Sequence, residues 1–428
     1  MNIKLKLNGV AFFMLMLMFA LLVTPSYIRA KSTGQIAFPV QAEGEWDDWD
    51  DSDWEDEDWE YDLEEKQTQP LVRYNRVEGV TLGIQMNKEY GERKTPTRPI
   101  PFGSWAYAFA AKEFQYQIGM EKGFTNTNRL AIGGEYHRMI DTPDAWFLKS
   151  EENSVAAFLV KEDFHDFYFR DGWSAYLSQN LWKALTLTAG YQSEQCKTVE
   201  KNTNWSLFGG DKFRENPVID EGDLKSLFGK LDFDTRNSAR NFRRGWHIQA
   251  EGEFTLDDFE TDFPYDRVMI DIRRYQPMGF SDNVNFRVRA GSAKGTVPWQ
   301  KSFYLGGIGT LRGYHHKEFP AGPMEFGGNR MLLAQLEYNV GESVMTEYIT
   351  GGFPFFHLIL FADGGWVGQA DSGLGLHEGF DMLNKDNFKS DVGIALANQT
   401  GDFRVELAKR TDTGYKPYMF WFRFNRTF

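Results

Sequence analysis

The chain ends on Tyr418-Met-Phe-Trp-Phe-Arg-Phe-Asn-Arg-Thr-Phe428, a segment whose two faces differ sharply. Side chains alternate across a β-strand, so Phe420, Phe422, Phe424 and Phe428 share one face. The other face carries Trp421, Arg423, Asn425 and Thr427. A soluble sandwich cannot bury that second face in its core, whereas a barrel with a wet lumen accommodates it. We therefore predict a lipid-facing last strand, with Phe424 and Phe428 as its C-terminal signal.

The same alternation recurs upstream and predicts an all-β protein, a transmembrane antiparallel barrel of about sixteen strands. Phe403, Val405 and Leu407 alternate with Arg404 and Glu406, for example. Fifteen strands are expected near 77–86, 104–113, 115–124, 129–138, 170–179, 182–194, 224–234, 245–254, 265–276, 283–292, 329–339, 356–367, 389–398, 402–410 and 417–428. Such barrels have even strand numbers, and Ser154–Val160 is the best candidate for a sixteenth strand, although this segment is also compatible with a helix.

Composition agrees with a barrel whose strands are half polar. Mean hydropathy is -0.49, yet 16% of the residues are aromatic. Beyond the N-terminus no apolar run approaches the roughly 20 residues of a membrane helix. The single cysteine, Cys196, excludes an intramolecular disulfide and a cysteine-based metal site.

Two segments precede the predicted barrel. Residues 1–30 read as a secretory signal peptide, with Lys4 and Lys6 before the apolar core Val10–Val23. Residues 31–70 contain fifteen acidic residues between Glu43 and Glu65, interspersed with tryptophans, and they predict a disordered periplasmic segment. This segment is either a solvated tail or a tether for a basic partner or for the mouth of the barrel. The barrel is expected over 71–428, where charge is nearly balanced and nothing indicates nucleic-acid binding.

One long connection carries a distinctive motif, Phe303-Tyr-Leu-Gly-Gly-Ile-Gly-Thr-Leu-Arg312-Gly313-Tyr314. Its glycines permit sharp turns that could carry Arg312 into the barrel. A buried guanidinium requires partners, and Glu337 and Asp363 alternate with apolar neighbours on the next two strands, which places them on the lumen side. We expect Arg312 to pair with Asp363, Glu337 or both.

This pattern resembles the bacterial surface antigen barrels of outer-membrane-protein assembly factors (BamA- and TamA-like proteins) and two-partner-secretion translocators. In that family a Val-Arg-Gly-Phe/Tyr loop between strands eleven and twelve folds into the lumen. Leu311, Arg312, Gly313 and Tyr314 match this motif with leucine in place of valine, and the family's acidic partners fall on Glu337 and Asp363. Further similarities are Gly327-Gly-Asn329, Asp234-Thr-Arg-Asn237 followed by Gly245, and, more weakly, Tyr74-Asn-Arg-Val-Glu-Gly79.

The resemblance implies an exported protein of the bacterial outer membrane that assists insertion or translocation of protein or lipid. Its implied partners are outer-membrane lipid and unfolded outer-membrane or secreted polypeptides. Assembly factors of this family carry periplasmic POTRA domains, and the 31–70 segment is too short for one, which argues against insertase activity. The alternative is a passive channel or a structural surface antigen. A role of the Arg312 motif that is purely structural is also left open.

Enzymatic and metal chemistry are not expected. Gly307-Ile-Gly309 lacks the third glycine and the helix of a dinucleotide loop, and no hydrolase or phosphate-loop motif occurs. His315, His316 and Glu318 offer metal-ligand groups, but adjacent histidines on an extended segment point apart. We therefore predict no catalytic residue, metal or cofactor.

Overall fold

The computed structural model describes residues 68–428, apart from 88–98, 125–129, 183, 211, 237–243, 257, 279–281, 321–326, 341–355, 399–400, 402, 413–417 and 425–428. The predicted signal peptide, nearly all of the acidic segment and Phe428 lie outside these residues. No helix among the described residues is long and apolar enough to cross a membrane.

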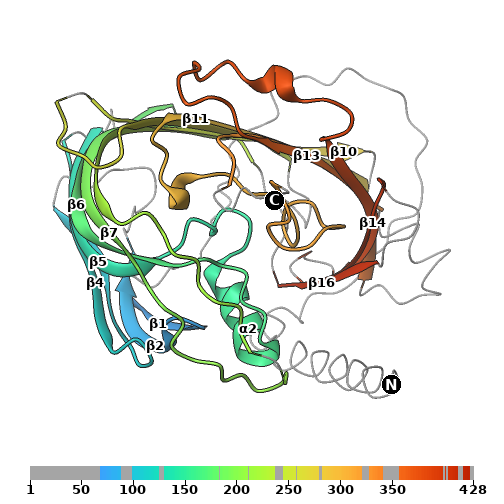
Figure 1. The fold of residues 1–428 in the computed structure, drawn as a ribbon, viewed down its shortest axis with the longest axis horizontal. Helices are drawn as coiled ribbons and strands as arrows, with labels where there is room; N and C mark the ends of the chain where they lie inside the picture. The colour runs from blue at the N-terminus through green and yellow to red at the C-terminus, as the bar shows by residue number, and fades with distance from the viewer. Residues whose placement is uncertain are drawn as a thin grey trace, which may run out of the picture. The chain divides into compact units, whose positions relative to one another are not determined.

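Sixteen antiparallel strands form one sheet in which each strand pairs with its neighbours in sequence (Figure 1). The strands are β1 Thr68–Asn75, β2 Gly79–Met86, β3 Ile100–Ala108, β4 Glu113–Gly123, β5 Leu130–Asp141, β6 Tyr168–Trp182, β7 Leu185–Thr198, β8 Gly222–Asp234, β9 Gly245–Phe254, β10 Tyr265–Met278, β11 Asp282–Gly295, β12 Arg330–Asn339, β13 Phe356–Gly368, β14 Lys389–Asn398, β15 Arg404–Arg410 and β16 Met419–Arg423. The helices are α2 Ser150–Val160 and the short η2 Trp299–Lys301 and η4 Phe380–Met382.

The sheet curls round, and α2 and the β11–β12 connection lie within its curve (Figure 1). The outer edges of β1 and β16 share no ladder over the described residues, so hydrogen bonding there does not close the sheet. The all-β, sixteen-stranded architecture predicted from the alternation is confirmed.

Some details of the strand prediction are wrong. The strand expected at 104–113 instead spans Ile100–Ala108, and residues 109–112 form the turn before β4. The proposed sixteenth strand Ser154–Val160 is part of α2, which has Glu151 and Glu152 in its first turn, where the helix dipole favours acidic groups. The missing strand is β1, which begins at Thr68, before the predicted start of the barrel at residue 71. The last two errors cancel in the strand count, so the motif connection still lies between strands eleven and twelve.

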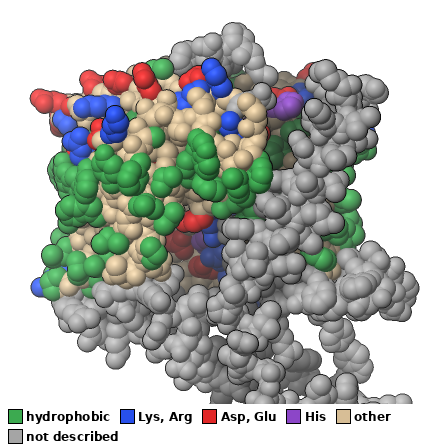
Figure 2. Space-filling view, turned by 90° about the horizontal axis from the view of Figure 1, so that it is seen from below, with side chains coloured by type: hydrophobic (Ala, Val, Ile, Leu, Met, Phe, Trp, Pro, Cys, Tyr) green, Lys and Arg blue, Asp and Glu red, His purple; other side chains and the backbone are tan. Residues whose placement is uncertain are grey.

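Burial alternates along the strands, with apolar side chains exposed and polar side chains buried, as in a membrane barrel. On β14, Val392, Ile394 and Leu396 are each about half exposed, whereas Asp391 and Ala395 are buried. A water-soluble sheet with this exposure would present apolar side chains to solvent and enclose acids. Figure 2 shows the outward hydrophobic side chains gathered as a band, with charged groups collected along one rim.

Connections at the two rims differ in length. The β5–β6, β7–β8, β11–β12 and β13–β14 connections are long and share one rim, because alternate connections of an up-and-down sheet fall on the same side. At the opposite rim the β6–β7 connection is only residues 183–184. This asymmetry matches barrels that have short periplasmic turns and long extracellular loops.

Candidate functional site: the Arg312 cluster

Arg312 is fully buried and lies among carboxylates from three strands. Asp363 of β13 receives a two-pronged contact, from Nε at 2.7 Å and from Nη2 at 2.8 Å. Nη1 contacts Glu337 of β12 at 2.7 Å and Glu406 of β15 at 3.2 Å. The structure therefore brings the three residues of the sequence hypothesis, Arg312, Glu337 and Asp363, into one cluster.

Two members of the cluster were not assigned from sequence. Arg404 of β15 contacts Glu337 at 2.9 Å, and Glu406 lies beside it on the same strand. Both fall at the lumen parity that the alternating pattern predicted, but nothing in the sequence connected them to Arg312. Two guanidinium groups thus face three carboxylates, and a fourth acid, the buried Asp391, lies opposite Asp363 in the β13–β14 register.

The rest of the motif fixes the loop in place. Leu311 packs in a core cluster with Tyr314, Leu305 and Met331. Gly313 approaches β14 and β15 so closely that a Cβ there would stand 2.6 Å from the Cβ of Asp391. A side chain cannot be accommodated at this position.

The last strand also contributes to the anchoring of the loop. The indole Nε1 of Trp421 on β16 donates a 2.7 Å hydrogen bond to the carbonyl oxygen of Arg312. The lumen side of the C-terminal strand is thus hydrogen-bonded to the motif, while Phe420 on the other face is half exposed. Phe424 lies just after β16 and is partly buried.

A second charged cluster joins four connections at the long-loop rim. We call Arg76, Asp144, Asp163, Asp166, Arg214 and Lys317 the loop hub. Lys317, from the β11–β12 connection, contacts Asp144 at 2.7 Å and Asp166 at 2.5 Å, both in the β5–β6 connection. Arg76, from the β1–β2 connection, contacts Asp163 at 3.1 Å, and Arg214, from the β7–β8 connection, pairs with Asp166.

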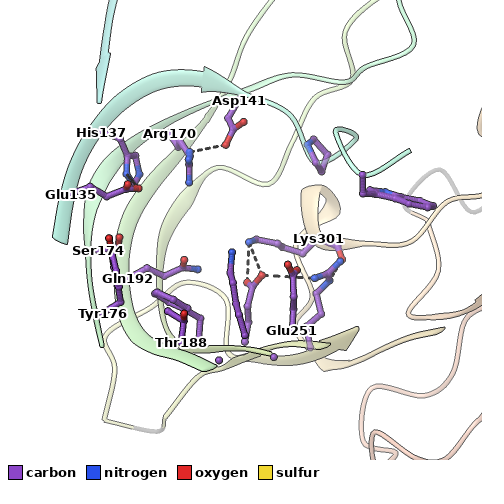
Figure 3. Close-up of a pocket in the computed structure, with 18 of the residues that line it drawn as sticks. Glu135, His137, Asp141, Arg170, Ser174, Tyr176, Thr188, Gln192, Glu251 and Lys301 are labelled. Carbon is purple, nitrogen blue, oxygen red and sulfur yellow. Dashed lines mark hydrogen bonds and ion pairs between the residues drawn. The ribbon is translucent and has the colours of Figure 1, made fainter. Parts of the chain in front are cut away.

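A polar cavity of about 630 Å³ is lined by residues of the strands β4 to β11 and their connections (Figure 3). Hydroxyl and amide side chains such as Ser174, Thr188 and Gln192 line its wall. Charges at its ends are paired, Arg170 with Asp141 at 2.8 Å and Lys301 with Glu253 at 2.9 Å. Such a lining favours water and neutral polar groups over a strongly charged ligand.

One group in the described part of the chain has the composition of a metal site: Asp232, Asp234 and His247 on β8 and β9. Arg236 already holds Asp234, with Nε 2.9 Å from Oδ1, and His247 lies 3.3 Å from Asp232. These contacts account for the cluster without an ion. The candidates His315 and His316 separate as expected of adjacent residues, with His315 exposed and His316 against the rings of Phe147 and Phe164.

Fold and site together define a membrane-type β-barrel in which a glycine-flanked arginine from one long connection is bound to the inner wall. Consistent with this class, the chain belongs to the Omp85 superfamily, whose domain model matches residues 160–428. A model of the C-terminal domain of a family of unknown function (DUF5686) matches residues 52–237.

Individual relatives are distant. The outer membrane protein assembly factor BamA of Nitratidesulfovibrio vulgaris is 24% identical over 216 residues, 45% of this chain and 24% of that protein. The chain thus matches about a quarter of the length of this curated relative. A crystal structure of BamA from Haemophilus ducreyi lacking POTRA domains 1–3 superposes with a TM-score of 0.52 and 15% identity, covering 83% of this chain and 69% of that one. CdiB from Acinetobacter baumannii gives a TM-score of 0.39 and 10% identity, covering 83% and 58%.

Proposed function

We propose that this protein resides in the bacterial outer membrane and assists the insertion or translocation of polypeptides there. Export by the predicted signal peptide would deliver it, and its outward apolar band would contact outer-membrane lipid. Its relatives include a protein named as an assembly factor of outer membrane proteins, which supports the proposal at the level of general role.

The observation that carries the proposal is the seam, by which we mean the facing outer edges of β1 and β16. No ladder joins these edges over the described residues. A static pore needs a fully paired wall, because unpaired backbone groups in hydrocarbon cost several kcal/mol each. A wall that is unpaired at one place is suited to open toward the lipid and admit an extended chain.

The Arg312 cluster supplies the rigidity that such opening requires. It ties the β11–β12 connection to β12, β13 and β15, and Trp421 extends this anchoring to β16. The half of the wall that leads to the seam therefore moves with the loop as one unit. In this proposal the motif positions the last strand and does not contact the client.

A reconstitution experiment tests this function. Purified full-length protein in phosphatidylcholine vesicles should accelerate the folding of a urea-unfolded eight-stranded outer-membrane barrel relative to protein-free vesicles, measured by its heat-modifiable gel migration. Vesicles containing an unrelated sixteen-stranded porin are the control for bilayer defects. Rates equal to the porin control, together with stable ion conductance, would instead support the alternative of a passive channel.

A further inference from the structure

Helix α2 lies between β1 and β16 at the seam (Figure 1). It belongs to the β5–β6 connection, yet it makes polar contacts with both outer edges of the sheet. Glu152, Asn153 and Ala157 are its buried residues. The helix therefore occupies the place where a direct ladder between the first and last strands would form.

On the β1 side, α2 binds the strand edge through one backbone group and one ring. The backbone N–H of Tyr74 donates a 3.2 Å hydrogen bond to the Oγ of Ser154. The Tyr74 ring packs edge-on against Phe158 with 5.5 Å between centroids. Backbone groups alternate between the two edges of a strand, so the nitrogens of Val72 and Pro70 share this outer edge. Proline has no N–H to satisfy, which suits a strand edge without a paired neighbour.

On the β16 side, one carboxylate of α2 accepts the hydrogen bonds. Oε1 of Glu152 accepts from the backbone N–H of Phe424 at 2.9 Å and from Nε of Arg423 at 2.8 Å. Glu152 and Arg423 are both almost completely buried. A single acidic side chain thus satisfies the backbone N–H that follows β16 and neutralises the buried Arg423.

The two attachments of α2 differ in how many groups they depend on. Toward β1, Asn153 donates to Asp163 at 2.8 Å, and Asp163 is itself bound to Arg76 just after β1. Toward β16, the hydrogen bonds that the helix accepts all go to Glu152. Loss of that contact would remove the polar attachment of α2 to β16 and leave only the packing of Ala156 against the cluster that contains Trp421, while the helix stays anchored beside β1.

We propose that α2 is an intramolecular cover of the seam and that the Glu152 carboxylate is its releasable contact. While α2 is in place, it competes with any strand that would pair with the edges of β1 and β16. Its displacement from β16 exposes those edges to an extended polypeptide segment. That this segment belongs to a client rests on the function proposed above, whereas the release of α2 itself does not.

Hydrogen–deuterium exchange on the full chain in phospholipid nanodiscs tests the release. Glu152→Ala should make the Phe424 amide exchange about tenfold faster, the effect of losing one charge-assisted hydrogen bond, with the Tyr74 amide little changed. Glu151→Ala, an exposed acid one residue earlier in the same helix, is the matched control and should leave both amides unchanged. Glu152→Gln should give a smaller increase and serves if the alanine variant does not fold. Unchanged exchange at Phe424 in both Glu152 variants would overturn the proposal.

A reversible bridge tests whether the cover limits access. In a Cys196→Ala background, Glu152→Cys and Phe424→Cys are joined by a short bifunctional thiol reagent that dithiothreitol removes. Bridging should slow folding of the urea-unfolded eight-stranded probe about tenfold, and reductant should restore the rate. A bridge between Ser178→Cys and Thr188→Cys, whose native hydroxyls lie 3.1 Å apart on β6 and β7, is the control and should have no effect.

The outcomes separate the two proposals. If the probe folds equally fast with and without the bridge, α2 does not limit access to the seam and this inference is wrong. If neither the wild type nor the unbridged variant accelerates folding of the probe, the proposed function is wrong, and the exchange measurement alone decides whether α2 releases β16.

Discussion

Arg312 is a residue whose replacement should cost much stability. It is fully buried with Asp363 and Glu337, so removing its charge leaves buried carboxylates with one cation fewer. We expect Arg312→Ala to lower the free energy of unfolding by about 3–5 kcal/mol. Urea unfolding in phospholipid micelles measures this. Arg138→Ala is the control, because its ion pair with Asp171 is largely solvated and should cost about 1 kcal/mol or less.

A double-mutant cycle separates the Arg312–Asp363 pair from general damage. Asp363→Asn keeps the size of the side chain and removes one negative charge from a cluster with excess acid. The double variant should therefore be more stable than the sum of the single losses predicts, with a coupling of about 1–3 kcal/mol. A coupling near zero would mean that the two-pronged contact contributes nothing to stability.

His316 provides a pH dependence at the same scale. Burial, together with Arg214 and Lys317 nearby, lowers the pKa of His316 well below its ordinary 6.5, although Asp166 opposes this and His165 adds to it. The unfolded chain then binds a proton that the folded loop does not, so stability falls as pH drops through about 6.5. We expect proteolysis of the β11–β12 connection to accelerate between about pH 8 and pH 5.5. His316→Phe, which cannot be protonated, should reduce this acceleration, and an undiminished response would assign it to other groups.

At the scale of elements, the local sequence pattern predicted most strands well. It failed where packing against the rest of the chain determines the secondary structure. The strands with regular alternation, such as β13 and β14, were located closely. β1 was missed because its first residues, Thr68–Pro70, adjoin the acidic run and were included in the predicted segment 31–70. The Ser154–Val160 pattern did not distinguish strand from helix, and α2 is decided by its place against Tyr74 and Phe424.

The site shows the same division. Arg312, Glu337 and Asp363 could be predicted to meet because glycine spacing and strand parity constrain them. Glu406 and Arg404 had the right parity, but several other lumen charges do as well, and pairing across the barrel depends on strand tilt that no sequence pattern encodes. The alternation of side chains along the strand likewise could not predict that Trp421 donates a hydrogen bond to the carbonyl oxygen of Arg312.

At the scale of the whole molecule, the loop hub joins four connections at the long-loop rim, and we expect it to keep conductance low. Lys317 belongs to the β11–β12 connection and bridges Asp144 and Asp166 within the hub. Lys317→Met would leave these acids facing each other with one cation fewer, so the β5–β6 and β11–β12 connections should separate. Planar-bilayer recordings should then show a severalfold larger and noisier conductance than the wild type, with weak ion selectivity because acidic and basic side chains line the polar cavity in equal number.

The control for this prediction is Lys294→Met, which removes an ion pair to Asp266 whose lysine is 40% exposed. A solvated pair of this kind contributes about 1 kcal/mol or less, so the recordings should match the wild type. Equal conductance in all three proteins would show that the loop hub does not gate the lumen. The restriction would then lie with the motif connection itself, which Arg312 holds independently of Lys317 through Asp363 and Glu337.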